Sequence, residues 1–192
     1  MSVTLPFNEA KATEAAAYLL KLSGAPMSYI KLIKLLYLVD REALLVHGRP
    51  VTTDQYVQTD QGPSLSQISD LITVDSFGHS VWSDFISPLH GELEVELRRE
   101  APPSELSEAE AELIESVFVN FGGKSWRELI EFSRTLPEWT NPRGTKIPLD
   151  YADILKAHGL SPSEVAVITS ELESLAAVTT LLEPWHSDAI PT

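Results

Sequence analysis

The stretch SYIKLIKLLYLVDREALLVHGRPVTTDQYVQTDQGPS, residues 28–64, decides the fold. Its first half is almost wholly apolar and ends at a Gly-Arg-Pro break, which is typical of a helix that stops at a glycine. A short extended segment then leads to Gly62-Pro63, which predicts a turn before the next helix. A helix over 28–47 with so thin a polar stripe should be the central, nearly buried helix of the molecule.

A helical wheel of residues 28–47 separates two kinds of polar side chain. Asp40 and His47 lie almost opposite the polar sector, among apolar residues, and a carboxylate in such a place needs hydrogen-bond partners. We expect Asp40 to bind the turn at 61–63 and hold it in place. The sector that should face solvent contains Lys31, Lys34, Arg41 and Glu42.

Helix-start signals recur along the rest of the chain. A Ser or Asn before an apolar run, often with Glu or Gln three residues later, marks an N-terminal cap and predicts a helix. We expect one helix over 8–23, another from Ser64 to about Ile72 with Gln67 completing its capping box, and a last one ending near Leu182. Further helices should begin at Ser107, Ser125, Asp150 and Ser161.

Residues 80–99 break this helical pattern. The segments 81–87 and 92–98 resemble two strands, and the second alternates apolar and charged residues as a half-buried strand does. The sequence therefore predicts a mostly α protein: a single compact multi-helix domain over 1–182 with a small antiparallel β-hairpin at about 80–99. Residues 183–192 should form a flexible C-terminal tail.

Composition limits the possible partners and location. The formal net charge is −14, and residues 100–192 carry six basic against sixteen acidic side chains. Such a chain should be repelled by phosphate, so we expect no direct nucleic-acid binding, whereas a basic protein partner suits it. The apolar runs are too short to cross a membrane, and the absence of cysteine and of a secretory start favours the cytoplasm.

The motifs of common enzyme classes are missing from the sequence. The five histidines lack metal-ligand spacing, and there is no phosphate-binding loop or nucleotide fingerprint, so we expect no metal, no cofactor and no catalytic residue. One alternative is a small hydrolase in which Asp40 orients His47 as a general base. A structural role for Asp40 is favoured, because two helical turns separate the pair by roughly 10 Å.

Two blocks of the sequence resemble the Panacea domain, the SocA-like antitoxin family associated with prophages. The first is KLIKLLYLVDREALLVHGRPVTTDQYVQTDQGPSLSQISDLI, residues 31–72, with its KLxKLLYxxD helix and Gly-Pro turn. The second is LSEAEAELIESVFVNFGGKSWRELIEFSRTLPEW, residues 106–139, which ends at Pro-Glu-Trp. The helix after Ser161 looks like an addition to this pattern.

The resemblance implies a non-enzymatic antitoxin that neutralises a cognate protein toxin by direct binding. Some members of the family would instead deliver the toxin to an AAA+ protease. A separate alternative is a structural or regulatory protein of a phage or mobile element, which would self-assemble without any toxin.

The loop over 56–64 should lie near the working surface, because exposed loops on rigid helices commonly carry recognition. The structural residues of the motif should be Tyr37, Asp40, Gly62 and Pro63. The candidate toxin-binding residues are Tyr56, Gln58, Asp60, Gln61 and Ser64.

Overall fold

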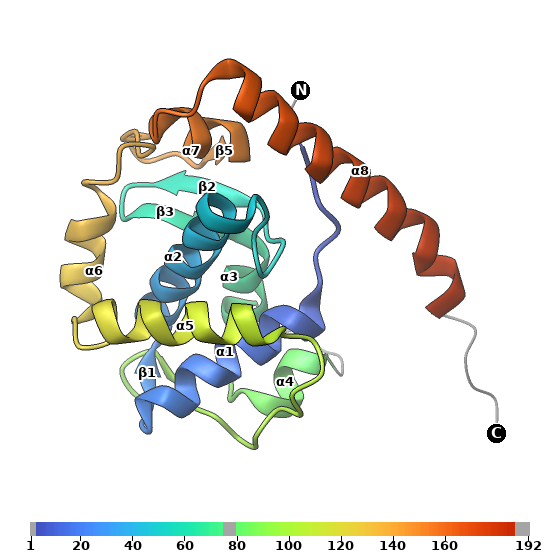
Figure 1. The fold of residues 1–192 in the computed structure, drawn as a ribbon. Helices are drawn as coiled ribbons and strands as arrows, with labels where there is room; N and C mark the ends of the chain where they lie inside the picture. The colour runs from blue at the N-terminus through green and yellow to red at the C-terminus, as the bar shows by residue number, and fades with distance from the viewer. Residues whose placement is uncertain (1–2, 75–79, 187–192) are drawn as a thin grey trace.

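Helix α2, Tyr29–His47, runs through the middle of the molecule, and the other elements pack around it (Figure 1). The computed structural model describes residues 3–74 and 80–186. The apolar side chains of α2 form the centre of the core, and Leu32, Leu35, Leu36 and Leu44 are fully buried. The helix ends at Gly48, whose φ of +71° is a conformation that glycine adopts without strain.

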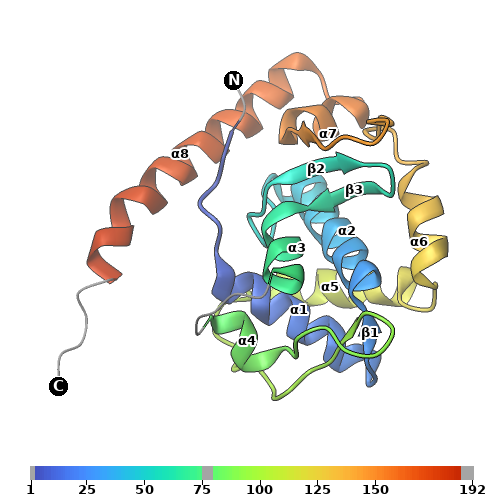
Figure 2. The same cartoon turned by 180° about the vertical axis from the view of Figure 1, so that it is seen from behind.

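The remaining helices surround α2 on several sides (Figures 1 and 2). They are α1 Glu9–Ser23, α3 Ser66–Thr73, α4 Val81–Phe85, α5 Glu108–Phe121, α6 Trp126–Ser133, α7 Tyr151–Ala157 and α8 Pro162–His186. The predicted fold class, a mostly α compact domain with small antiparallel sheets, is confirmed.

Two small antiparallel sheets complete the described part of the fold. Strands β2, Tyr56–Thr59, and β3, Gly62–Leu65, form a hairpin, and β5, Ile147–Leu149, pairs with the other edge of β2. Strand β1, Met27–Ser28, pairs with β4, Glu94–Val95. The hairpin packs on α2, so the loop at its tip is supported by the most buried helix of the molecule.

Several predicted helix starts are confirmed at the level of individual hydrogen bonds. Asn8 accepts a hydrogen bond from the backbone of α1. Ser107, Ser125 and Ser161 each form a reciprocal capping box with a glutamate three residues later. These ends are correct because a capping box depends only on residues within one helical turn.

The predicted capping box of Ser64 with Gln67 is wrong. Ser64 lies in β3, and α3 begins at Ser66. The first turn of α3 is capped by Asp54, whose carboxylate accepts hydrogen bonds from the backbone N–H groups of Gln67 at 2.9 Å and Ile68 at 2.8 Å. The cap therefore comes from thirteen residues upstream, beyond the reach of a local pattern.

The predicted strand at 81–87 is also wrong over most of its length. Val81–Phe85 is the short helix α4, and Ser80 caps it in a reciprocal pair with Ser83. Antiparallel bridges do join Ile86 to Leu97 and His90 to Glu94, so part of the predicted pairing within 80–99 is present. The hairpin built of two named strands lies at 56–65 instead.

Helix α8 continues further than the sequence indicated. It extends to His186, so residues 183–186, which were assigned to a flexible tail, belong to a helix. The rest of that tail, 187–192, lies outside the described residues.

Candidate functional site

The β2–β3 hairpin lies very close to the end of α6. Gly62 has a φ of +90°, and a Cβ atom at this position would lie 2.2 Å from Oγ of Ser133. Only glycine avoids both the backbone strain and this overlap. The predicted structural role of Gly62 therefore has a specific geometric basis in the structure.

Lys34 holds the opposite side of the hairpin. Its ammonium group donates a hydrogen bond of 2.5 Å to the carbonyl oxygen of Pro63. Lys34 is buried, with only 3% of its surface exposed. Burial, and secondarily the charge of Arg134, lowers the pKa of Lys34 to about 7. The expectation that Lys34 belongs to a solvated stripe is wrong, because β3 covers that part of α2.

A third set of contacts comes from the segment after α6. Arg134 donates to the backbone carbonyl of Asp60 at 2.7 Å, and the indole of Trp139 donates to the carbonyl of Thr59 at 3.1 Å. In the reverse direction, the amide of Gln58 donates to the carbonyl of Glu138 at 2.8 Å. We call residues 133–139 the clasp, because they hold the tip of the hairpin by both side chains and backbone.

Glu138 connects the clasp to α2. Its carboxylate is buried and accepts hydrogen bonds from the hydroxyl of Tyr37 at 2.9 Å and from Nε of Arg41 at 2.6 Å. Tyr37 and Arg41 are four residues apart and so lie on one face of the helix. The partner of Tyr37, which we expected to be a structural residue, is therefore Glu138 of the Pro-Glu-Trp segment, 101 residues away.

Asp40 fixes the segment that enters the hairpin. The carboxylate accepts hydrogen bonds from the backbone N–H groups of Val51 (3.0 Å) and Thr52 (2.8 Å), and from the hydroxyls of Thr52 (2.5 Å) and Tyr56 (3.1 Å). Asp40 is fully buried, and burial raises its pKa to about 7, although the hydrogen bonds from Thr52 and Tyr56 oppose the rise. The expected contact with the turn at 61–63 is wrong: Asp40 binds the start of the extended segment instead.

The candidate toxin-binding residues divide into two groups. Tyr56 and Gln58 are buried, at 3% and 5% exposure; the hydroxyl of Tyr56 donates to Asp40, and Nε2 of Gln58 donates to the clasp. Asp60 and Gln61 are exposed at the tip, and Ser64 is half-buried. The first pair supports the loop from within, and the other three residues face outward.

A groove of about 330 Å³ runs beside the tip of the hairpin. Asp60, Gln61 and Ser64 line one side of it, and Lys34 and Lys146 also contribute to its walls. We call it the hairpin groove. It brings together three of the five sequence-predicted binding residues, and the charged side chains that line it are Lys34, Asp60 and Lys146.

The supporting residues Lys34, Arg41, Thr52, Glu138 and Trp139 were not predicted as part of the site. The Pro-Glu-Trp at the end of the second sequence block was the available signal for two of them. Nothing in the local pattern around Thr52 indicates that it would bind Asp40.

The side chains of Asp40 and His47 do not form a dyad. Asp40 is sealed in the core with the partners named above, whereas His47 is exposed at the end of α2. Within residues 3–74 and 80–186 there is also no group of three His, Cys, Asp or Glu side chains that could hold a metal ion. In the same part of the chain, no helix has the length and apolarity needed to span a membrane.

Fold and site together define a helical protein that presents a rigidly supported β-hairpin. The family described as antitoxin SocA-like, Panacea domain, matches residues 32–140, which covers α2 from Leu32 onward, the hairpin, α5, α6 and the clasp. The match spans more than half of the chain, and the protein belongs to this family. Comparisons with curated proteins and with solved structures found no match.

Proposed function

We propose that this protein is an antitoxin that neutralises a protein toxin by binding to it directly. Membership of the SocA-like antitoxin family is the observation that carries this proposal. The matched residues, 32–140, contain α2 contacts with the hairpin and the whole clasp. Strand β5, which pairs with β2, and Gly144, which donates to Asp60, lie outside the match.

The geometry of the hairpin supports a binding role. Loops that must become ordered on binding lose affinity, whereas a preorganised surface avoids that cost. The tip at Asp60 and Gln61 is fixed by Arg134, Ser133 and Trp139, so a partner would meet a surface that is already in place. We infer that Asp60, Gln61 and Ser64, beside the hairpin groove, contact the toxin.

Co-expression with the neighbouring gene tests the proposal. The neighbour alone should arrest growth, and growth should return when this protein is made with it. A harmless neighbour, or continued arrest in the presence of both proteins, would show that the proposal is wrong.

The amount of toxin in the rescued cells separates two modes of action. Neutralisation by binding leaves the toxin intact and co-purifying with this protein. Delivery to an AAA+ protease lowers the toxin level, and deletion of the protease then restores it.

A further inference from the structure

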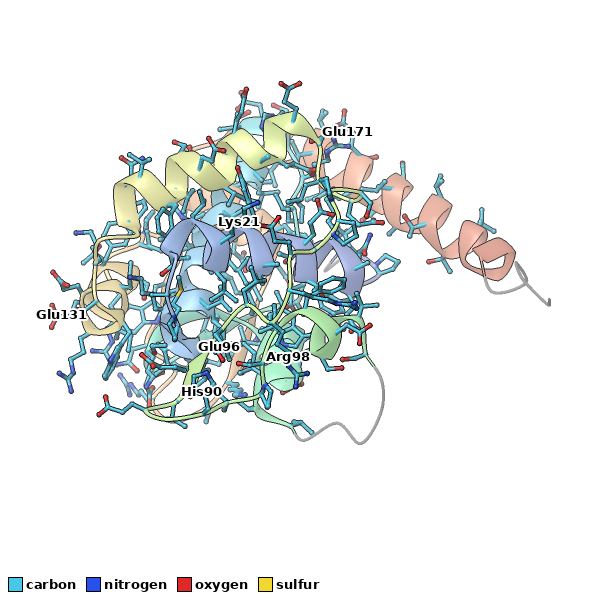
Figure 3. All side chains as sticks on the ribbon, turned by 90° about the horizontal axis from the view of Figure 1, so that it is seen from below. Lys21, His90, Glu96, Arg98, Glu131 and Glu171 are labelled. Carbon is cyan, nitrogen blue, oxygen red and sulfur yellow. The ribbon has the colours of Figure 1, made fainter. Side chains whose placement is uncertain are left out.

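The outer half of α8 stands apart from the rest of the molecule. Figures 1 and 2 show the helix passing over α7 and then continuing beyond the body, and Figure 3 shows its last described turns projecting away from the other described elements. The first part of α8 is anchored by Val165 and Leu172, which are buried at 6% and 1% exposure. Helix formation in water normally requires tertiary packing of an apolar face, so the unpacked half calls for an explanation.

Large apolar side chains lie exposed on this outer half. Leu175, Val178 and Leu181 are 39%, 53% and 72% exposed. Their spacing of three residues places them along one side of the helix. Contiguous exposed apolar residues rimmed by polar ones mark interaction sites on soluble proteins. We call these three residues the α8 patch.

The charge around the patch indicates what could cover it. No Lys or Arg follows Lys156, while residues 157–192 contain five acidic residues. Glu171 and Glu173 are exposed on the helix just before the patch. The groove of about 440 Å³ at the base of the outer half does include Arg49 and His47, so the acidic character belongs to the helix itself rather than to the groove beneath it.

A second copy of this chain is a poor occupant for the patch. Pairing two α8 helices would bring together two segments that are acidic and lack any basic side chain, and like charges across an interface oppose association. A partner with apolar side chains flanked by Lys or Arg satisfies both the apolar and the acidic features. An amphipathic helix presents this combination on one face.

We propose that the α8 patch binds a basic amphipathic helix of the protein partner. That the partner is the toxin rests on the proposed antitoxin function. The chemistry of the surface does not depend on that function. The patch lies outside residues 32–140, which match the family, so it is a contact surface separate from the hairpin.

A synthetic peptide tests the chemistry without the toxin. The probe is a fluorescently labelled 18-residue helix of leucine and lysine with all leucines on one face, titrated with the full chain at low salt. Binding should weaken as salt is added, because charge complementarity is screened. A peptide with glutamate in place of every lysine should bind at least tenfold more weakly. Equal binding of the two peptides, or no binding of the lysine peptide, would overturn the proposal.

Variants locate the binding to α8. In the full chain, the double substitution Val178→Lys with Leu181→Lys should weaken binding of the lysine peptide at least tenfold. Val119→Lys is the matched control, since Val119 is 82% exposed on α5 and outside the patch. The double variant should melt at the same temperature as the wild type, because both side chains are exposed. Unchanged peptide binding by the double variant would overturn the proposal.

Two further readouts separate the alternatives. If size-exclusion chromatography shows a wild-type dimer that the double variant converts to a monomer, the occupant is a second copy and the proposal is wrong. In the co-expression assay, the double variant should fail to restore growth while Val119→Lys restores it. If the wild type itself fails to restore growth, the antitoxin function is wrong, and the peptide titration still decides whether the patch binds a basic helix.

Discussion

The ammonium group of Lys34 lies 2.5 Å from the carbonyl oxygen of Pro63, and both residues are buried. This contact joins the central helix to the hairpin at the residue next to Gly62. Burying a cation that has no counter-charge destabilises the folded state. Lys34 lies directly beneath the proposed binding loop, so this destabilisation acts on the hairpin. The contact therefore makes the stability of the hairpin sensitive to the protonation of one lysine.

Replacing Lys34 by Met should flatten part of the pH dependence of stability. The pKa of Lys34 is about 7 in the folded chain and 10.5 in its unperturbed state. Between these values the unfolded chain binds one proton more, so the free energy of unfolding rises with pH, by up to about 1.4 kcal/mol per pH unit. In urea unfolding at pH 7, 8 and 9, the wild type should gain stability relative to Lys34→Met.

Lys146→Met provides the control for this experiment, because Lys146 lines the same groove but is exposed. Its profile should run parallel to that of the wild type. Parallel profiles for the wild type and Lys34→Met would show that the buried ammonium does not titrate in this range.

Gly62→Ala should destabilise the protein more than Gly144→Ala. Both glycines have a similar positive φ, +90° and +84°, so both alanines suffer backbone strain of about 1 kcal/mol. Only at Gly62 would the new Cβ also overlap Ser133, whereas Gly144 has nothing within 4 Å. We expect about 3 kcal/mol for Gly62→Ala and about 1 kcal/mol for Gly144→Ala in chemical denaturation. Equal losses would mean that the hairpin can move away from α6 at no cost.

Local sequence patterns were sufficient for the parts of the fold that are stabilised locally. The three capping boxes at Ser107, Ser125 and Ser161 were predicted correctly, and the burial of Asp40 followed from its position on the helical wheel. The same wheel wrongly places Lys34 in solvent, because a helical wheel gives the direction of a side chain but not whether another element, here β3, covers it.

The remaining errors have a common physical cause. The cap of α3 comes from Asp54, which is brought to the helix by the path of the chain rather than by sequence spacing. In α4, Trp82 and Phe85 are three residues apart, which places both on one face of a helix but on opposite faces of a strand, and both contact the core. The contact between Tyr37 and Glu138 spans 101 residues, and no single sequence pattern contains that information.

Asp40→Ala should destabilise the fold by about 3 kcal/mol. The substitution leaves two backbone N–H groups and two hydroxyls buried without an acceptor, and each unsatisfied donor is costly. His47→Ala should change the melting temperature little, because His47 is exposed. Thermal unfolding of both variants separates this structural role from a joint role of the two residues. A large, equal loss for both would contradict it.

Tyr37→Phe and Glu138→Ala should show coupled effects on stability. Each removes the same hydrogen bond between the hydroxyl of Tyr37 and the carboxylate of Glu138. The Phe variant alone should lose about 1 kcal/mol. Glu138→Ala should lose more, because it also leaves the partly buried guanidinium of Arg41 without its counter-charge.

A double-mutant cycle measures the coupling. The double variant should be more stable than the sum of the single losses predicts, by at least 0.5 kcal/mol, because the shared bond is counted once. Strict additivity would show that the bond contributes nothing to holding the clasp on α2.

Gln61→Arg should weaken toxin binding without weakening the fold. The hydrogen bonds at Gln61 involve its backbone N–H and carbonyl, so the side chain is free to change. A long charged side chain at the tip of the hairpin would obstruct a partner seated over Asp60 and the hairpin groove. We expect a Kd about tenfold higher, a loss of roughly 1.4 kcal/mol, with an unchanged melting temperature. Val119→Arg, on the exposed side of α5, is the matched control and should bind as the wild type does. Calorimetric titration of the purified toxin measures both variants, and wild-type affinity for Gln61→Arg would place the contact surface away from the hairpin tip.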